Sequence, residues 1–297
     1  MIAFIVDTLV HATPLIITVL AVAIAFRAGI WNIGADGQFI AGATAAAWVG
    51  VSAPSEIGLL ALPLALIAGA VAGGIWAAVA AWLRSRFGVL EVISTIMLNF
   101  IATYGASYLV RGPLQEPTHV FPQTSSIVSG ARIPILIAGT RLHWGFVLGL
   151  LLAGVTWWVM RYSAVGFKIR ASGLNPFAAR SAGLINVSRV TSAAFVASGA
   201  FAGIAGAIEV SGVTFALYEN ISPGYGYTAI AVALLAGLNP IGVIGTGILF
   251  GALETAAGTM QRNVGIPATT ASVIEAVVIL VVIGITQFRS RRSVLST

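Results

Sequence analysis

The sequence predicts an all-α protein: a polytopic transmembrane helical bundle of about nine spans, with some short or broken helices. Of its 297 residues, 58% are hydrophobic and only 8% are charged, and the mean hydropathy is +1.00. These values lie outside the range of soluble globular domains. Apolar runs of about 20 residues, enough to cross roughly 30 Å of hydrocarbon as a helix, recur along the chain. We therefore expect residues 1–297 to form a single transmembrane domain.

The individual spans follow from the places where the apolar runs begin and end. The first run is typical of a retained helix, because no positive charge precedes it and Asp7, His11 and Pro14 interrupt it. The run at 227–237 is short, since about 11 helical residues rise only about 16 Å, half a crossing. In chain order we expect spans near residues 3–26, 34–53, 59–82, 91–110, 144–160, 191–213, 227–237, 241–257 and 271–288.

Basic residues set the expected orientation, because cytoplasmic loops of membrane proteins carry an excess of Lys and Arg. If the loop 161–190 and the C-terminal tail are cytoplasmic, most of the basic residues lie inside. This arrangement places the N-terminus outside, and it explains the net charge of +6 without a nucleic-acid partner. The inside group is Arg27, Arg84, Arg86, Arg161, Lys168, Arg170, Arg180, Arg189, Arg289, Arg291 and Arg292, and the outside group is Arg111, Arg132, Arg141 and Arg262.

Small residues and an internal similarity indicate how the helices pack. Helices in a bilayer associate through close backbone approach, and three glycine pairs with a spacing of four lie within expected spans: Gly69/Gly73, Gly199/Gly203 and Gly247/Gly251. We expect a packing role for them. Residues 37–79 and 225–257 each form a Gly/Ala-rich span, a break and a second span, which is consistent with a repeated hairpin.

The stretch NIGADGQF, residues 32–39, places polar residues and glycines between two apolar runs. Free backbone groups at membrane depth are tolerated only where protein or cavity water satisfies them. We interpret the stretch as a broken helix, in which Asn32, Asp36 and Gln38 either hydrogen-bond loosened backbone or face a water-filled path. An ordinary cytoplasmic turn is the alternative. Asn99, near the middle of its helix, either bridges helices or meets substrate.

The residues needed for several kinds of chemistry are missing. There is no cysteine, and the three histidines are scattered, so we expect no metal site and no cofactor. The sole lysine, Lys168, does not stand in a Gly-Lys-Ser/Thr phosphate loop, so the chain is not itself a P-loop ATPase. Neither H-E-x-x-H nor G-x-S-x-G occurs. The sequence therefore argues against an enzyme.

Carboxylates within spans are costly in lipid and can mark transport sites. Glu209, Glu254 and Glu275 are such residues. The expected topology places all three toward the outer ends of their helices, where interfacial water or Arg262 can reach them. We favour that structural interpretation, and a transport role stays the alternative.

The loop 161–190 contains a predicted surface helix in the stretch RASGLNPFAARSAG. Asn175 suits the N-cap, Pro176 the first helical position, and Gly183 the helix end. About seven residues span only some 10 Å, too short to cross a membrane. Such a helix can present side chains to a partner that supplies motion, or rest on lipid headgroups. The candidate coupling residues are Asn175, Pro176, Phe177, Ala178, Ala179, Arg180 and Gly183.

Four stretches carry a family resemblance: ATPLIITVLAVAIAFRAGIWNIGADGQF (12–39), EVISTIMLNF (91–100), GLNPFAARSAG (173–183) and SPGYGYTAIAVALLAGLNPIGVIGTGILFGAL (222–253). Together they resemble the permease subunits of bacterial ABC importers for simple sugars and nucleosides, within the larger group that includes ribose and branched-chain amino-acid permeases. The first and last stretches are the most specific to the nucleoside-type branch. Gln38 resembles the subtype with Gln at this position, where the sister permease usually has Met.

The resemblance implies a multi-pass subunit of the bacterial plasma (inner) membrane. It implies a second permease subunit, as a homo- or heterodimer, two cytoplasmic ATP-binding subunits and an extracytoplasmic substrate-binding protein. The Asn175–Gly183 helix matches the segment that docks on the ATPase, and residues 32–39 match the broken segment that lines the pathway. The external loop 110–143, with four prolines, is then a docking surface for the binding protein. Family members usually have one more helix before the one that begins this chain.

The function expected from this resemblance is import by alternating access, powered by the separate ATPase subunits. The solute would be a nucleoside or a simple sugar, a choice that the resemblance alone supports, although Phe215, Tyr218, Tyr225 and Tyr227 could stack on a base. Two alternatives remain at this point. An ion-coupled secondary transporter would use Glu254 or Glu209 as its ion site, and a passive facilitator would need no coupling helix.

Overall fold

The computed structural model describes residues 2–181 and 185–264, together with Val273 and Val277. This part of the chain is helical and contains no strand, only two isolated β-bridges. Three short turns of other helix types, at Ser55–Leu60, Ser129–Ala131 and Val210–Thr214, accompany the α-helices. The α-helices are α1 (Ile2–Arg27), α2 (Ala35–Ser52), α3 (Ala61–Phe87), α4 (Glu91–Arg111), α5 (Gly145–Tyr162), α6 (Ala164–Leu174), α7 (Pro176–Ser181), α8 (Val187–Glu209), α9 (Tyr225–Leu235) and α10 (Pro240–Val264).

Six of the described helices are long and apolar enough to cross a membrane, namely α1, α3, α4, α5, α8 with the turn after it, and α10. α2 is not among them because Asp36, Gln38 and its small residues lower its hydropathy. α9 has 11 residues, which confirms the expected half crossing. The predicted span 271–288 lies outside the described residues, apart from Val273 and Val277. The count of about nine spans therefore stays a prediction.

The sequence-based boundaries were wrong in three places by more than three residues. α3 continues to Phe87, α8 begins at Val187, and α10 continues to Val264. Polar and charged residues at these helix ends hid the continuation, because hydropathy falls where a helix leaves the apolar layer. The loop 161–190 also contains α6, which the sequence analysis missed. The side chain of Ser163 caps α6 by accepting a hydrogen bond from Gly166 N–H.

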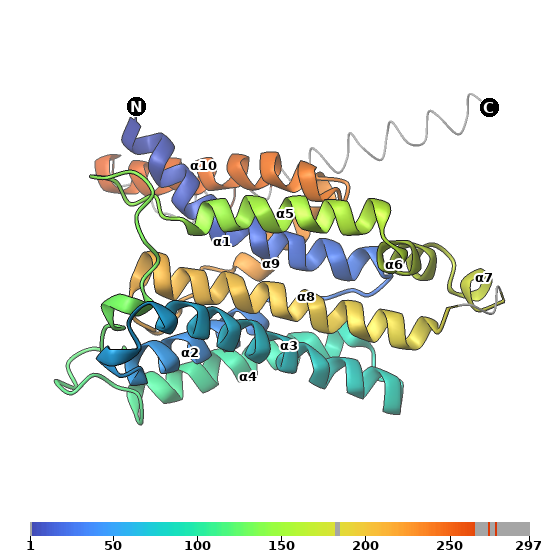
Figure 1. Ribbon diagram of the computed structural model, residues 1–297, viewed down its shortest axis with the longest axis horizontal. Coiled ribbons are helices and arrows are strands. Elements are labelled where there is room, and N and C mark those ends of the chain that lie inside the picture. The colour runs from blue at the N-terminus through green and yellow to red at the C-terminus, as the bar shows by residue number, and fades with distance from the viewer. Residues whose placement is uncertain (1, 182–184, 265–272, 274–276, 278–297) are drawn as a thin grey trace.

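The helices run between two ends of the bundle (Figure 1). We call the end that carries residues 112–144 the loop end, and the end that carries α6 and α7 the α7 end. α1 begins at the loop end, where Val6 and Val10 pack on Leu142, and it ends at the α7 end, where Arg27 Nε donates to Leu238 O (2.7 Å). The basic residues in the described part of the chain lie at helix ends, in α6 and in loops. Those of the predicted inside group lie at the α7 end, and those of the predicted outside group lie at the loop end.

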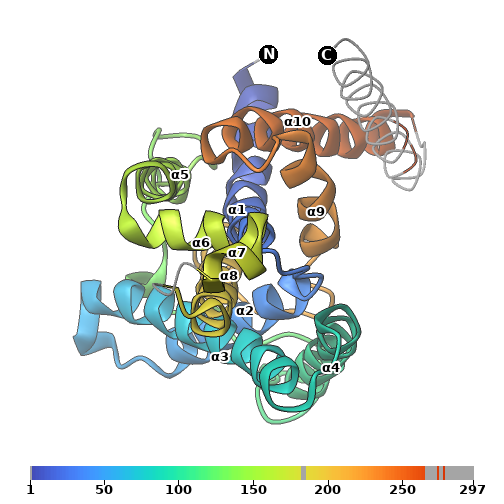
Figure 2. The ribbon, with the colours of Figure 1, turned by 90° about the vertical axis from the view of Figure 1, so that its right-hand side faces the viewer.

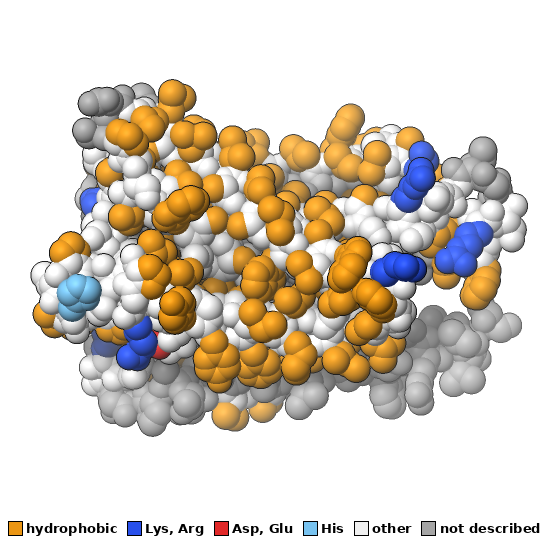
Figure 3. Space-filling model, turned by 90° about the horizontal axis from the view of Figure 1, so that it is seen from below, with side chains coloured by type: hydrophobic (Ala, Val, Ile, Leu, Met, Phe, Trp, Pro, Cys, Tyr) orange, Lys and Arg blue, Asp and Glu red, His pale blue; other side chains and the backbone are white. Residues whose placement is uncertain are grey.

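Seen from the α7 end, α1, α2 and α8 lie in the middle, and α3, α4, α5, α9 and α10 surround them (Figure 2). α1 and α8 are accordingly the most deeply buried of the candidate spans. On the face shown in Figure 3, hydrophobic side chains cover the middle of the molecule, and the basic side chains lie toward its two ends. This is the surface expected of a protein that lies in a bilayer.

The glycine pairs predicted from the sequence are contact points between helices. Gly199 and Gly203 of α8 lie against the backbone of Gly73 and Gly69 of α3, and a Cβ on any of the four would overlap the opposite backbone or an alanine methyl group. Gly42 of α2 lies on the same part of α8. Backbone contact of this kind replaces the water-driven packing of soluble proteins. We call α2, α3 and α8 the glycine block.

The third pair joins α10 to α1. A Cβ on Gly247 would meet the Ile16 side chain, and one on Gly251 would meet Ala12 and the backbone oxygen of Thr8. All three predicted pairs therefore have the packing role that the sequence analysis expected.

The two similar hairpins of the sequence run in opposite directions. α2 ends at the loop end, where Gly50 O accepts a hydrogen bond from Val128 N–H (2.9 Å). α9 ends at the α7 end, next to Leu238 and Arg27. A pair of short helices in corresponding positions with opposite directions is the arrangement of inverted repeats in transporters.

The external loop is tied to the segment that follows α8. Backbone N–H groups of Thr124, Ile127 and Ile133 donate to Leu217 O, Phe215 O and Ser211 O at 2.8–2.9 Å. These bonds provide partners for backbone groups of the loop and of the turn that ends α8. The loop is thus a fixed cover over the loop end of the bundle.

Candidate functional site

The N-terminal ends of α2 and α9 meet inside the bundle. The carboxylate of Asp36, in the first turn of α2, accepts a hydrogen bond from Gly226 N–H in the first turn of α9 (3.0 Å) and another from Ser222 Oγ (2.6 Å). Gly226 lies directly on the backbone of Asp36, so a side chain there would overlap it. Helix N-termini carry a partial positive charge, which this one carboxylate offsets for both helices. We call the contact between residues 32–38 and 222–227 the half-helix junction.

Asn99 connects the junction to α4. Its Oδ1 accepts a hydrogen bond from Gly37 N–H (2.8 Å), and its Nδ2 donates to Ile33 O (2.9 Å) and to Tyr227 OH (3.1 Å). Asn99 lies eight residues into α4, about 12 Å along the helix. The junction is therefore at membrane depth, and one amide side chain satisfies backbone groups just before and just after the start of α2.

Asn32 and Gln38 form a second polar group on the α8 side of the junction. Their side-chain amides pair with each other, with N···O distances of 2.8 and 3.1 Å. Asn32 also accepts from Gly34 N–H and donates to Ser198 Oγ, which in turn donates to Ala21 O on α1. This chain of hydrogen bonds fixes the segment between α1 and α2 against the middle of α8.

The structure therefore gathers all four predicted pathway residues around one break in the chain. Asn32, Asp36, Gln38 and Asn99 are all buried, and each is hydrogen-bonded. None of them lines any of three cavities found in the described part of the chain, which lie between α2, α3 and α4, around Arg180 of α7, and between α1, α9 and α10. Their geometry supports loosened backbone, the first of the two roles weighed from the sequence, and contact with solute stays a prediction.

Sequence reasoning missed the partners of these residues. Ser222 stands three residues before the first residues of α9, a spacing typical of helix capping, and its Oγ accepts from Gly224 and Tyr225 N–H at 3.2 Å. That spacing could have identified it. Nothing in the sequence singles out Ser198, which lies within the small-residue face of α8.

A cavity of about 450 Å³ opens beside the junction, on the side of the loop end. We call it the outer cavity. Its walls come from α1 and α10, with Arg141 of the external loop at its rim. We call its floor the most buried of its apolar and aromatic lining residues, Leu15, Phe250 and Tyr225, the last of which is the first residue of α9. The polar residues that line it are Asp7, His11, Arg141, Thr228, Glu254, Thr255 and Arg262.

Two of the three carboxylates noted in the sequence lie in the described part of the chain. Glu254 lines the outer cavity, where its Oε1 is 4.0 Å from His11 Nδ1. Glu209, the last residue of α8, is buried, and its Oε2 has no hydrogen-bond partner among the described residues. Glu275 lies outside the described residues. A transport role for these carboxylates stays the alternative to the structural role that the sequence analysis favoured.

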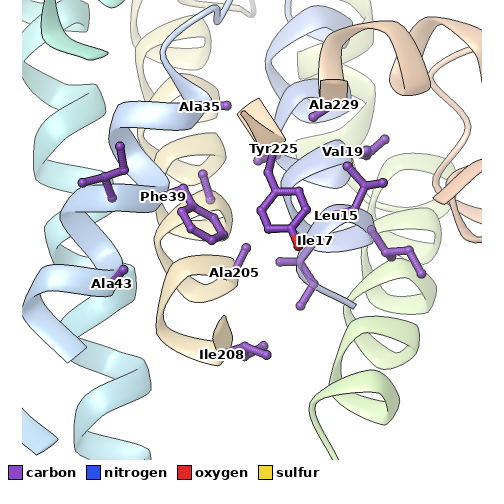
Figure 4. Packing of buried hydrophobic residues seen from close by; sticks show 14 of the residues in the cluster. Leu15, Ile17, Val19, Ala35, Phe39, Ala43, Ala205, Ile208, Tyr225 and Ala229 are labelled. Atoms are coloured by element: carbon purple, nitrogen blue, oxygen red, sulfur yellow. The ribbon is translucent and has the colours of Figure 1, made fainter. Parts of the chain in front are cut away.

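The aromatic residues considered for stacking have different environments. Phe215 lies under the guanidinium of Arg132, 4.9 Å from ring to Cζ, and Tyr227 binds Asn99. Tyr225 is buried and packs on Phe39 with ring centroids 5.6 Å apart, between α1, α2 and α8 (Figure 4). Tyr218 is partly exposed at the loop end, in a bridge to Gln123.

The short helix predicted after Asn175 is present as α7. Asn175 Oδ1 accepts hydrogen bonds from Phe177 N–H (3.1 Å) and Ala178 N–H (3.0 Å), so the expected cap is formed. Ala179 is buried against the bundle, whereas Phe177 has 78% of its surface exposed and Arg180 is also exposed. Gly183, the predicted helix end, lies outside the described residues. The helix thus leaves one aromatic ring and one cation exposed at the α7 end, and Arg180 also lines a cavity that Arg84 borders.

Ionisable groups hold the loop end together. The carboxylate of Glu116 accepts hydrogen bonds from Gln123 Nε2, Thr118 Oγ1 and Phe121 N–H, and these bonds lower its pKa. Glu219 binds Arg111 (2.6 Å) and Ser107, which lowers the pKa of Glu219. Burial, helped by the nearby charge of Arg141, lowers the pKa of His143 to about 4, so its ring is neutral at pH 7.

Comparison with known proteins identifies relatives over nearly the whole chain. Residues 4–283 match the family described as branched-chain amino acid transport system / permease component. The guanosine ABC transporter permease protein NupP of Bacillus subtilis (strain 168) is 39% identical over 285 residues, which cover 93% of this chain and 80% of that protein. The glucose ABC transporter permease protein TsgB13 of Haloferax volcanii is 37% identical over 93% of this chain and 75% of its own length. The nucleoside ABC transporter permease protein NupB of Lactococcus lactis is 32% identical over 92% and 77%.

Proposed function

Because the chain belongs to the branched-chain amino acid transport system permease family, we propose that it is the membrane-spanning permease of an ATP-driven importer for nucleosides or simple sugars. It is a multi-pass protein of the plasma (inner) membrane and not an enzyme. ATPase subunits and a substrate-binding protein belong to importers of this family. The nucleoside and sugar classes come from the names of the relatives, two of nucleoside type and one glucose permease.

The finer organisation is part of the proposal. A second permease subunit, identical or of the sister type, completes the membrane part, and each subunit has about nine spans, including the predicted span 271–288. We assign the docking surface for the binding protein to the external loop. Its rigid attachment to the segment after α8, through Thr124, Ile127 and Ile133, supports this assignment because a docking surface must transmit force without yielding.

The observation that carries the energy-coupling step is the form of α7. Asn175, Pro176, Phe177, Ala178, Ala179 and Arg180 form a capped helix that leaves Phe177 and Arg180 exposed at the end with most of the basic residues. Gly183 is assigned to the same docking segment from its place in the sequence. Closure of the ATPase pair on ATP would push α7, and the push would rock the permease subunits between outward and inward openings.

The solute path is assigned to the half-helix junction. Asn32, Asp36, Gln38 and Asn99 keep two helix ends in register at membrane depth. Interrupted helices are retained in membranes where they border a pathway. In this proposal the hydrogen bonds of the four side chains keep the path closed. The solute passes beside α9 when these bonds break and the junction opens.

A charge reversal on α7 tests the proposal. Arg180→Glu should abolish solute uptake by the complete importer while ATP hydrolysis continues, because the reversed charge on α7 no longer matches the surface of the ATPase subunit. Arg86→Glu, which reverses an exposed charge at the same end of the bundle but outside α7, is the matched control and should retain uptake. Uptake at the wild-type rate by Arg180→Glu proteoliposomes would contradict the coupling role.

The solute class needs a separate measurement. Titration of the partner binding protein with a panel of nucleosides and sugars should reveal one preferred class. Transport by the permease that persists without the ATPase subunits but collapses with an ion gradient would instead favour the secondary-transporter alternative.

A further inference from the structure

We propose that the outer cavity is a binding site for a neutral, hydroxyl-rich solute, such as the ribose of a nucleoside or a hexose, which rests there after it leaves the binding protein. This inference rests on the proposed function and adds a site and its residues to it. The cavity's volume of about 450 Å³ lies within the range of small-molecule sites, roughly 300–1,000 Å³.

The position of the cavity suits a receiving site. Arg141, at the rim, belongs to the external loop that we assign to docking, and Tyr225, at the floor, is the first residue of α9. The neighbouring residue, Gly226, donates its N–H to Asp36. A solute that enters from the loop end therefore descends between α1 and α10 and stops directly above the half-helix junction.

The charges of the lining favour a neutral occupant. Two carboxylates, Asp7 and Glu254, face two guanidinium groups, Arg141 and Arg262, within the same cavity. Their formal charges cancel when His11 is neutral. A solute with a net charge would leave that charge uncompensated in a partly desolvated space, which is costly. A neutral solute meets no such penalty.

The chemistry of the lining favours hydroxyl groups. Carboxylates accept hydrogen bonds from hydroxyls, and guanidinium groups donate to hydroxyl and ring oxygens, so a sugar can bond with both. Thr228 adds a hydroxyl group to the wall. The rings of Tyr225 and Phe250 provide an apolar surface at the floor, where the C–H face of a sugar or a base can pack.

The cavity also explains ionisable groups that the half-helix junction does not use. His11 and Glu254 have side chains that are 39% and 30% exposed, although both lie within predicted spans. Exposure of such groups to hydrocarbon is unfavourable, whereas exposure to a wet cavity is not. Their combined presence on α1 and α10 therefore points to a space that water and solute enter.

Binding should be measured on the importer assembled in nanodiscs with its ATPase subunits but without the binding protein. Equilibrium dialysis would use radiolabelled guanosine, ribose and glucose, with ribose 5-phosphate and glucosamine as charged competitors. We expect saturable binding of at least one neutral solute, with at least about tenfold weaker competition by its charged analogue. Absence of saturable binding, or equal competition by the charged compounds, would overturn the site.

Substitutions locate the binding. Asp7→Asn and Glu254→Gln should each weaken it by about tenfold or more, the factor for loss of one hydrogen bond to a charged group. Gln261→Ala, at an exposed position on α10 outside the cavity lining, is the matched control and should bind as wild type. Size-exclusion profiles establish that each variant assembles. If Glu254→Gln does not assemble, Asp7→Asn, near the beginning of α1, still tests the proposal. Unchanged binding in an assembled variant of either kind overturns the proposal.

Uptake by the complete importer separates the two levels of inference. If wild-type importer takes up nucleosides or sugars while binding in the nanodisc is unaffected by Asp7→Asn and Glu254→Gln, the cavity assignment fails and the proposed function stands. If wild-type importer takes up neither class, the proposed function itself fails.

Discussion

The glycine block and the half-helix junction are held together by different forces. In the block, α2, α3 and α8 touch backbone to backbone at Gly42, Gly69, Gly73, Gly199 and Gly203. At the junction only one glycine, Gly226, lies on the opposite backbone, that of Asp36, and hydrogen bonds of Asp36 and Asn99 connect α9 with α2 and α4. Both regions lie in the interior of the same bundle.

The difference shows which part of the molecule can move. Close-packed backbone has no alternative arrangement of similar energy, because any sliding opens voids or creates overlap. A hydrogen bond can exchange its partner for water or solute at a small net cost. We therefore expect the glycine block to move as one body and the junction to be the place where the pathway opens.

The largest effect is expected from a side chain inside the block. Gly203→Leu would place a branched side chain on the backbone of Gly69 and Gly73, and overpacking against backbone should cost about 3 kcal/mol or more. The variant should fail to accumulate as folded protein in the membrane, which expression yield and thermal unfolding in detergent would measure.

A glycine with free space around it provides the control for this substitution. Gly154 of α5 has no atom within 4 Å of an added Cβ, so Gly154→Leu should fold normally. Equal losses of folded protein for Gly203→Leu and Gly154→Leu would show that close packing in the glycine block is not the cause of the effect.

The second effect concerns the junction itself. Asp36→Ala removes the acceptor of the Gly226 N–H and of Ser222 Oγ, which should cost about 2–3 kcal/mol and leave two helix N-termini facing each other without a negative charge. We expect folded protein of reduced stability that no longer transports. Asp36→Asn keeps one acceptor oxygen and should show a smaller loss of thermal stability. An Asp36→Ala variant with wild-type uptake would exclude a role of the junction in transport.

A smaller effect is expected at the α4 side. Asn99→Ala frees Gly37 N–H, Ile33 O and Tyr227 OH, whereas Tyr227→Phe removes only the last of these bonds. The free energy of unfolding should therefore fall by about 1–2 kcal/mol in the first variant and by less in the second, as thermal unfolding in detergent would measure. The reverse order would show that Asn99 is not the centre of this network.

The smallest effect is expected from acid at the loop end. The lowered pKa of Glu116 means that its bonds stabilise the loop above the ordinary Glu pKa of about 4.3, and the contribution is lost as pH falls through the folded-state pKa. His143, with a pKa of about 4 when folded, favours unfolding progressively from about pH 6.5 down to about pH 4. The protection factors of residues 112–144 in hydrogen exchange, which correct for the intrinsic slowing of amide exchange in acid, should fall on acidification, and less so in Glu116→Gln. An acid-insensitive wild-type loop would contradict this assignment.

Much of the fold could be predicted because the bilayer constrains it. Hydropathy predicted the positions of the described spans, and the glycine spacing predicted a packing role for the glycines, since both are local patterns. Which helices the glycines join, α8 with α3 and α10 with α1, came only from the structure. α6 was missed because its 11 residues carry no continuous apolar run. The ends of α3, α8 and α10 were misplaced because polar and charged residues interrupt the apolar runs there.

The candidate site was only partly predictable. The glycines and polar residues at 32–39 indicated a break in a helix, but its partner at 222–227 is nearly 190 residues away in the chain, and only the three-dimensional fold brings them together. The outer cavity likewise combines α1, α9, α10 and Arg141, whose charges looked like separate interfacial groups in the sequence.

The opposite directions of α2 and α9 have a mechanical consequence. α9 ends beside Arg27 at the α7 end and begins against the start of α2, which continues to the external loop. The two helices therefore form a continuous path of contact from one end of the bundle to the other. A displacement of α9 at the α7 end is expected to reach α2 through the two hydrogen bonds of the Asp36 carboxylate.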